Sequence, residues 1–143
     1  AKVRIGLVMG ANGGIFPVIS KPIRYYVGAN LGSGKQWQSW IHINDLVRIF
    51  NELLINSSLS GTYNGVAPEP IRAGEMNKQI AKALHRPFFL PAIPGFLLRL
   101  VLGEMACLVL GGSRVSSAKF EKDAAFSFTF VRFEEALKEL VHV

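Results

Sequence analysis

An apolar helix face at residues 46–54 constrains the fold of this chain more than any other feature. Its side chains recur at the i, i+3, i+4, i+7 and i+8 spacing of one side of an α-helix: Leu46, Ile49, Phe50, Leu53 and Leu54. Short apolar runs at residues 3–9 and 62–66 stand on either side of this helix and have the length of buried strands. Strands separated by helices are typical of α/β domains, so the sequence predicts an α/β fold.

Periodicity and breaker residues predict the remaining elements. We expect helices at residues 16–26, 73–84, 96–102, 104–110 and 117–124, and a last helix that carries Phe133, Leu137, Leu140 and Val141. We expect strands or extended segments at residues 36–43, 88–90 and 126–130, the last because Phe alternates with Ser and Thr. Asn44 or Asp45 is expected to cap the helix at residues 46–54, and Ser116 the helix at residues 117–124.

The hydropathy of the chain is high for a small domain. Half of its 143 residues are hydrophobic and the mean hydropathy is +0.29. Either the core is unusually rich, or the chain covers a larger neighbour. We favour the second alternative, because the chain begins without Met, close to the apolar run at residues 3–9, and shows no signal-peptide pattern.

Charge and cysteine content exclude several classes of function. The net charge is +6, but the basic residues are scattered, so we expect a solvated surface and no nucleic-acid partner, with a nucleotide or phosphorylated substrate left open. The longest apolar stretch, residues 96–110, is interrupted by Arg99 and Glu104 and is shorter than the ~20 residues of a membrane span. The single cysteine, Cys107, allows no internal disulfide or zinc site. We expect it to be buried, and the protein to be cytoplasmic.

A glycine-rich loop at residues 10–14 invites comparison with a dinucleotide-binding turn. It follows an apolar run and precedes a helix, as such turns do. However, Phe16 occupies the third glycine position, Pro17 and Pro22 lie in the helix, and no acidic residue appears before Asp45. We favour an ordinary loop after a strand, with a minimal dinucleotide binder as a minor alternative.

A longer motif carries more information. Residues 32–46 read GSGKQWQSWIHINDL, which resembles a segment of the epimerase/dehydratase branch of the extended short-chain dehydrogenase/reductases. More narrowly, the chain looks like the atypical subgroup labelled epimerase family protein or sugar-nucleotide epimerase. Other stretches resemble the same subgroup in order along the chain: residues 4–10 (RIGLVMG), 63–68 (YNGVAP), 83–87 (ALHRP), 98–106 (LRLVLGEMA) and 133–140 (FEEALKEL).

The resemblance implies a parent of about twice this length, whose N-terminal Rossmann half binds NAD or NADP and is absent here. The chain would be the C-terminal part of an extended Rossmann-type fold. Residues 1–90 would supply the end of the sheet and the substrate-binding region, and residues 91–143 a small helical module. No cofactor is expected to bind to this chain alone.

The catalytic Tyr-x-x-x-Lys pair of such enzymes is also missing. Tyr25, Tyr26 and Tyr63 are the only tyrosines, and the fourth residue after each is not a lysine. In the family, the lysine lowers the pKa of the tyrosine so that it transfers a proton while hydride moves to or from the nicotinamide. We therefore expect no catalytic residue in this chain, and no metal site.

Some positions are expected to contact ligands because of the resemblance. Ile5, Gly6, Leu7 and Val8 would lie beside the nicotinamide, or would form an ordinary buried strand. The expected substrate-binding residues are Lys35, Gln36, Trp37, Gln38, Trp40, His42 and Arg114. For several of these, a structural role is the alternative: core packing for the tryptophans, hydrogen bonding for His42 and surface exposure for Arg114.

Gln38 departs from the family pattern. In nucleotide-sugar relatives this position is an arginine that holds the diphosphate, and an uncharged amide cannot make that bidentate, charge-assisted contact. The sequence therefore predicts the substrate-binding fragment of an NAD(P)-dependent epimerase or oxidoreductase, inactive alone. Its partners would be a small-molecule substrate and either the missing Rossmann half or a second copy, bound through an exposed apolar face. The alternative is a stand-alone, non-catalytic binding or interaction module.

Overall fold

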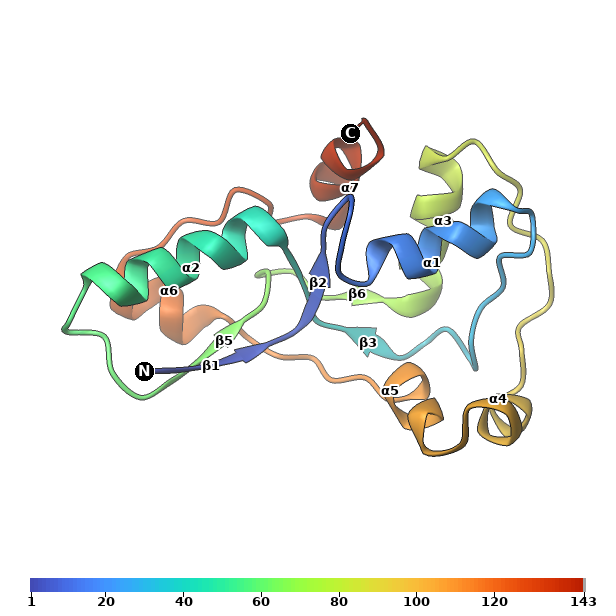
Figure 1. The fold of residues 1–143 in the computed structure, drawn as a ribbon, viewed down its shortest axis with the longest axis horizontal. Coiled ribbons are helices and arrows are strands. Elements are labelled where there is room, and N and C mark those ends of the chain that lie inside the picture. The colour runs from blue at the N-terminus through green and yellow to red at the C-terminus, as the bar shows by residue number, and fades with distance from the viewer. Residues whose placement is uncertain (143) are drawn as a thin grey trace.

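The computed structural model describes residues 1–142, with all side chains in that range except those of residues 101, 102, 105, 108 and 109. Short strands and helices alternate through its first half and helices dominate its second half (Figure 1). In chain order the elements are β1 (Lys2–Ile5), β2 (Leu7–Met9), α1 (Phe16–Arg24), β3 (Trp37–Gln38), β4 (Trp40–His42), α2 (Ile43–Ile55), β5 (Thr62–Gly65), β6 (Ile71–Arg72), α3 (Ala73–Ala83), α4 (Gly95–Leu102), η1 (Gly103–Met105), α5 (Ala106–Leu110), α6 (Ala118–Ala124) and α7 (Phe133–His142). The predicted α/β class is confirmed.

The strand expected at residues 3–9 is divided in two at Gly6. β1 pairs in parallel with β5, whereas β2 pairs in parallel with β4. The backbone N–H of Gly6 donates to the carbonyl of Gly65, and the next N–H, that of Leu7, donates to the carbonyl of Ser39. The chain thus changes partner at Gly6. A side chain there would clash with the Ser39 carbonyl oxygen and lie 2.8 Å from Val66, which is why glycine occupies this position.

The best-predicted helix, α2, begins earlier than expected and is capped differently. The backbone N–H of Asn44 donates to Nδ1 of His42, so His42 is the N-cap, and the prediction of Asn44 or Asp45 was wrong. Leu46 and Ile49 are buried as predicted, but Phe50 and Leu54 are 41% and 83% exposed. The helix therefore has a second apolar side that no described residue covers.

Asp45 instead anchors the segment at residues 126–130. Its buried carboxylate accepts hydrogen bonds from the backbone N–H groups of Thr129 and Phe130, at 2.9 to 3.1 Å, and from Arg48 at 2.7 Å. Because backbone donors of this segment bind a side chain, no strand ladder forms, and the predicted strand is wrong. The predicted alternation is nevertheless present, since Phe126, Phe128 and Phe130 are the more buried side chains.

Two apolar clusters form the core, and β4 separates them. Trp40 packs in the first with Met9, Met76 and Phe133, whereas Ile41 packs in the second with residues that include Leu46, Tyr63 and Phe120. Successive strand side chains point to opposite faces, so adjacent residues serve different clusters. The buried residues of α7, which are Phe133, Ala136, Leu137 and Leu140, share the first cluster with residues of the first half of the chain.

The C-terminal helices complete the fold. α6 begins one residue later than expected, with Ser117 at the N-cap position and no side-chain capping bond, so the prediction of Ser116 as the cap was wrong. The Ser116 hydroxyl, one residue earlier, accepts a hydrogen bond from the N–H of Ala118 at 3.2 Å. The strand expected at residues 88–90 is absent from the described chain, which instead runs as an irregular segment between Pro87 and Pro91. Cys107 is exposed on α5, contrary to the expected burial. Of the helices described, none combines the length and apolar character needed to cross a membrane.

Candidate functional site

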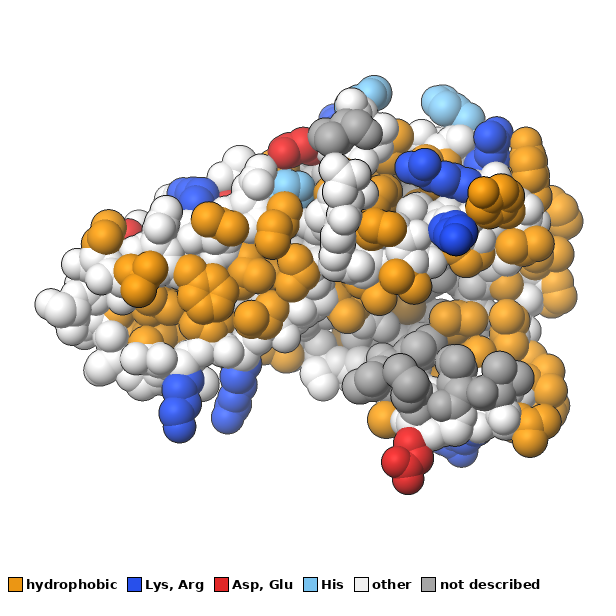
Figure 2. Space-filling model, in the orientation of Figure 1, with side chains coloured by type: hydrophobic (Ala, Val, Ile, Leu, Met, Phe, Trp, Pro, Cys, Tyr) orange, Lys and Arg blue, Asp and Glu red, His pale blue; other side chains and the backbone are white. Residues whose placement is uncertain are grey.

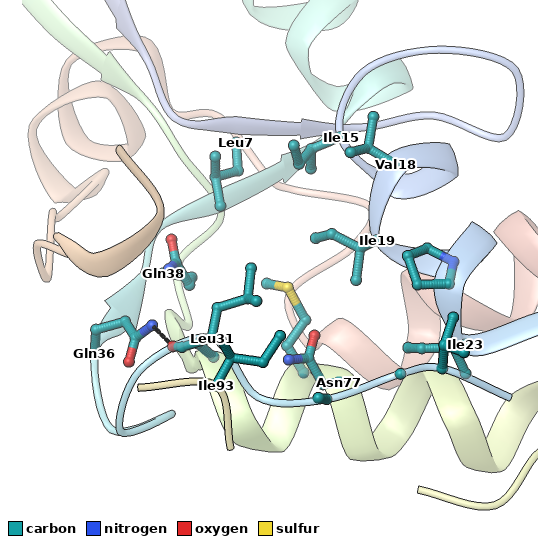
Figure 3. A pocket seen from close by; sticks show the side chains of 16 residues that line it. Leu7, Ile15, Val18, Ile19, Ile23, Leu31, Gln36, Gln38, Asn77 and Ile93 are labelled. Carbon is teal, nitrogen blue, oxygen red and sulfur yellow. Dashed lines mark hydrogen bonds between the residues drawn. The ribbon is translucent and has the colours of Figure 1, made fainter. Parts of the chain in front are cut away.

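A cleft of about 310 Å³ lies among α1, the loop that follows it, β3 and the start of α3 (Figure 3). Its volume is at the lower end of the range of roughly 300–1,000 Å³ that is usual for ligand pockets. The walls are mainly aliphatic, and the lining residues are Leu7, Ile15, Val18, Ile19, Pro22, Ile23, Val27, Gly28, Ala29, Leu31, Gln36, Gln38, Ala73, Met76, Asn77 and Ile93.

β3 gives the cleft its polar wall. Gln36 and Gln38 line the cleft, whereas Trp37, which lies between them, does not. This arrangement follows from the two-residue period of an extended chain. The side-chain Nε2 of Gln36 donates to the carbonyl of Leu31 at 2.9 Å (Figure 3). This hydrogen bond joins the residue before β3 to the loop between α1 and β3. Among the described residues, the side-chain amide of Gln38 has no hydrogen-bond partner.

The cleft carries no ionisable side chain within the described part of the chain. The nearby guanidinium groups lie against Trp37 instead: the Cζ atoms of Arg72 and Arg114 are 3.9 and 5.3 Å from its ring centre. The first N–H groups of α3 also have partners, because Ala73 and Gly74 donate to loop carbonyls at 2.9 and 2.8 Å. The lining of the cleft is therefore electrically neutral.

The structure separates the expected substrate-binding residues into three places. Gln36 and Gln38 line the cleft. Lys35 and Arg114 are exposed, and Trp37 is half-buried under the two arginines. Trp40 and His42 lie in the interior, outside the cleft.

The interior positions of Trp40 and His42 are defined by their contacts. The indole Nε1 of Trp40 donates to the carbonyl of Glu69 at 2.9 Å, and its ring packs edge-on against Phe133 at 5.2 Å. The ring of His42 packs 4.1 Å from that of Phe130, and its Nε2 has no partner in the described chain. Burial lowers the pKa of His42, and nearby Glu139 and Asp45 oppose this shift.

The expected cofactor-contact residues also divide. Leu7 lines the cleft, Ile5 is 50% exposed, and Val8 packs against the second core cluster. The N–H groups of Gly6 and Leu7 are bonded within the chain, so these donors are not available to a cofactor. Of these four residues, Leu7 alone lines the cleft, and the Ile5 side chain is half exposed outside it.

The glycine loop at residues 10–14 folds back on its own strand. The N–H of Ile15 donates to the carbonyl of Val8 at 2.8 Å, and Gly14 adopts a φ of +71°. A side chain at Gly14 would clash with the Val8 carbonyl, so the turn itself requires this glycine. Gly13 has no other atom within 4 Å of where a side chain would begin.

Sequence reasoning missed the contribution of α1 and of the segment before α4. Val18, Ile19 and Ile23 form one wall of the cleft and Ile93 closes another side (Figure 3). The apolar spacing of residues 15, 18, 19, 22 and 23 was the available signal, since it marks one face of a helix. Within the described residues, no group of three His, Cys, Asp or Glu side chains is arranged to hold a metal ion.

Comparison with known proteins gives consistent matches over nearly the whole chain. Residues 93–140 match a domain of unknown function, DUF1731. An Arabidopsis thaliana protein described as an SDR39U1 homolog, an epimerase family protein, is 41% identical over 141 residues, covering 99% of this chain and 40% of the relative. An epimerase family protein of Staphylococcus aureus strain N315 is 38% identical over 138 residues, covering 96% of this chain and 45% of the relative.

A solved structure agrees with these relatives. The crystal structure of human epimerase family protein SDR39U1 (isoform 2) with NADPH superposes with a TM-score of 0.89 at 33% identity, covering 98% of this chain and 47% of the human chain. The chain thus spans 40% to 47% of the length of these three proteins. Over nearly its whole length the chain is similar to epimerase family proteins, and it corresponds to the C-terminal part of such a protein.

Proposed function

We propose that this chain is the substrate-binding part of an NAD(P)-dependent epimerase or oxidoreductase and has no catalytic activity alone. The observation that carries the proposal is that Leu7, Gln36 and Gln38 line the same cleft although they are far apart in sequence. We expect Leu7 to contact the nicotinamide, and Gln36 and Gln38 to contact the substrate. A hydride-transfer enzyme requires its substrate and its nicotinamide to lie side by side.

The nicotinamide cofactor would supply hydride transfer, and this chain would supply one wall of its site. Ile5 and Leu7 offer apolar contact, and the strand that carries them is fixed through Gly6 and Leu7 to β5 and β4. The family relative that contains NADPH supports a cofactor in the assembled protein. The phosphate-binding turn and the Tyr-x-x-x-Lys pair would come from outside this chain.

Cofactor titration of the chain alone and of an assembled form tests this proposal. The assembled form joins residues 1–143 to the N-terminal part of the Arabidopsis relative, whose matching part is 41% identical. We expect NADPH to bind to the assembled form at micromolar concentrations and not to the isolated chain. Micromolar NADPH binding by the isolated chain would contradict the proposal.

Gly13→Val provides a control for the minor alternative, a dinucleotide site at residues 10–14. The open surroundings of Gly13 make this substitution sterically harmless to the fold. If the isolated chain binds NADPH and Gly13→Val abolishes that binding, the glycine loop is the cofactor site. NADPH binding by the assembled form that survives the substitution supports a site built mainly by the joined segment.

The protein partner that we propose is the N-terminal Rossmann part of an epimerase family protein. Ile43, Val47, Phe50 and Leu54 form an exposed apolar stripe along α2, at 39% to 83% exposure, and Figure 2 shows apolar side chains gathered over this end of the molecule. Within the described chain, β1 pairs only with β5, which leaves its other edge open. The relatives contain more than half of their length beyond the matched part, which is enough polypeptide to cover both features.

Size-exclusion chromatography with light scattering tests this partner. We expect the isolated chain to self-associate through the α2 stripe, and Val47→Glu with Leu54→Glu to restore a monomer. Co-expression with the N-terminal part of the Arabidopsis relative should give a one-to-one complex that the double variant weakens. A monomeric wild-type chain that forms no such complex would favour the stand-alone binding module.

The compartment that we propose is the cytoplasm. The single, exposed Cys107 has no cysteine partner within the sequence, and free thiols are usual in reducing compartments. Fluorescence microscopy of the tagged protein in its native cell checks this assignment.

A further inference from the structure

We propose that the cleft among α1, β3 and α3 binds an uncharged, largely apolar molecule and that its substrate carries no diphosphate. This inference names the chemical class of ligand that the cleft accepts. That the ligand is a substrate rests on the proposed function. It is carried by the charge distribution around β3, the state of the neighbouring helix ends and the lining of the cleft.

The positive charges near the cleft point away from it. Three basic side chains lie near β3, but alternation along the strand places them away from the cleft. Arg72 lies opposite Trp37 in the antiparallel β3–β6 pair, and both Arg72 and Arg114 cover the Trp37 ring. Arg72 also donates to the carbonyl of Lys35, and the Lys35 side chain is exposed. Among the described residues, no basic side chain lines the cleft between Gln36 and Gln38.

Helix N-termini are the other common anion sites in proteins. The leading N–H groups of α3 donate to the carbonyls of Gln36 and Gly34. At α1, Pro17 lies in the first turn and has no N–H to donate. A diphosphate in this cleft would lose hydration without gaining a charged side chain among the described lining residues, which is unfavourable.

The cleft offers apolar contacts and one neutral amide group. Most of the lining residues are apolar, and they include Val18, Ile19 and Ile23 of α1 and Met76 of α3; such walls favour apolar ligand atoms. Gln38 adds one amide without a partner among the described residues, which can both donate and accept a hydrogen bond. A ligand with an apolar body and a neutral carbonyl, hydroxyl or amide group fits this combination.

Two probes measured on the same protein test the inference. N-phenyl-1-naphthylamine is a neutral apolar fluorophore, and UDP carries the diphosphate. We expect the wild-type chain to enhance the fluorescence of the first probe at micromolar concentrations and to show no UDP binding below about millimolar concentration by calorimetry. UDP binding at micromolar concentration would overturn the inference and leave the proposed enzyme function standing.

Variants at Gln38 locate the neutral probe. Gln38→Arg should weaken binding of the naphthylamine at least tenfold and create measurable UDP binding, because it adds the missing cation to the cleft wall. Gln38→Met keeps the volume and neutrality and should retain the probe within about threefold. Leu54→Ser removes an exposed apolar side chain outside the cleft and should change nothing. Probe binding that is lost in Leu54→Ser and unaffected by Gln38→Arg would place the probe on the α2 stripe and contradict the inference.

The proposed enzyme function and the proposed neutral ligand class can be refuted independently. If the assembled form binds no NADPH while the naphthylamine results hold, the proposed enzyme is wrong and the neutral ligand cleft remains. If NADPH binds as expected and UDP competes with the naphthylamine, the enzyme stands and the neutral substrate class is wrong.

Discussion

Trp37 and Arg72 face each other across the antiparallel β3–β6 pair, with the Arg72 guanidinium carbon 3.9 Å from the centre of the Trp37 ring. Arg72 also donates to the backbone carbonyl of Lys35, in the irregular segment that leads into β3. One side chain thus contacts two positions, Lys35 and Trp37, on either side of Gln36 in the segment that forms the cleft wall. The same contact removes a cation from the cleft side of the strand, because Trp37 points away from Gln36 and Gln38.

Replacement of Arg72 by alanine tests this contact. We expect Arg72→Ala to lower the free energy of unfolding by about 1 kcal/mol, since exposed cation–π pairs contribute about 0.5–1 kcal/mol and one hydrogen bond is also lost. Urea denaturation measures the change. Arg114→Ala is the matched control and should cost less, because Arg114 lies farther from the ring, at 5.3 Å. Equal losses of unfolding free energy in the two variants would show that the closer Arg72–Trp37 contact does not contribute more to stability than the Arg114–Trp37 contact.

Asp45 is expected to be a major contributor to stability. Asp45→Asn removes the negative charge that accepts from Arg48 and from the N–H groups of Thr129 and Phe130, in a site where Asp45 has 0% exposure. We expect the free energy of unfolding to fall by about 2–3 kcal/mol. Arg48→Met should cost only about 1 kcal/mol, because the Arg48 side chain is 44% exposed. An Asp45→Asn variant as stable as the wild type in urea would refute this role.

Stability should fall in mild acid because of His42. Burial lowers the pKa of His42 in the folded chain below the value of about 6.5 that it has when unfolded, although Glu139 from α7 and Asp45 from α2 act in the opposite direction. The unfolded state therefore binds more protons below about pH 6.5, and the contribution is lost as the pH falls through the folded pKa.

Thermal unfolding between pH 7.5 and 5.5 measures this effect, with His42→Asn as the comparison. Asparagine is a good N-cap residue and retains an acceptor for the Asn44 N–H without titrating. The variant is expected to lose stability at neutral pH, through lost contact with Phe130, but to show a flatter pH dependence. An unchanged slope in the variant would assign the acid sensitivity to other groups.

Gly6 and Gly13 form a matched pair that tests the change of strand partner. Gly6→Ala places a methyl group against the Ser39 carbonyl and Val66, so we expect a loss of about 2 kcal/mol or more, in the range of overpacked cores. Gly13→Ala meets no neighbour within 4 Å and should leave stability unchanged or slightly raised. Urea denaturation of both variants provides the comparison, and similar stabilities would contradict the tight contact at Gly6.

Local patterns in the sequence were sufficient for most helices and for the α/β class. The buried side of α2 and the strand β5 follow from spacing and breaker residues that act over a few positions, whereas the caps of α2 and α6 differ from the expected ones. The neutral amide at Gln38 was also visible in the sequence. These features depend on neighbours along the chain, so no knowledge of distant contacts was needed.

Other features were decided only by contacts between distant segments. The apolar side of α2 that carries Phe50 and Leu54 looks the same in sequence whether it is covered or exposed. The segment at residues 126–130 has the alternation of a strand, but Asp45, more than 80 positions earlier, binds two of its backbone donors. The local sequence at residues 126–130 does not show that the Asp45 carboxylate takes backbone donors that a strand ladder would use.

The sequence by itself determined which residues are apolar, which can cap a helix and which lack charge. Tertiary structure decided which strand β1 and β2 each pair with, and that α1 joins β3 and α3 to enclose a cleft. The physical reason is the distance along the chain over which the interactions act. Secondary structure depends mainly on nearby backbone and side-chain groups, whereas a cleft exists only where surfaces from distant segments meet.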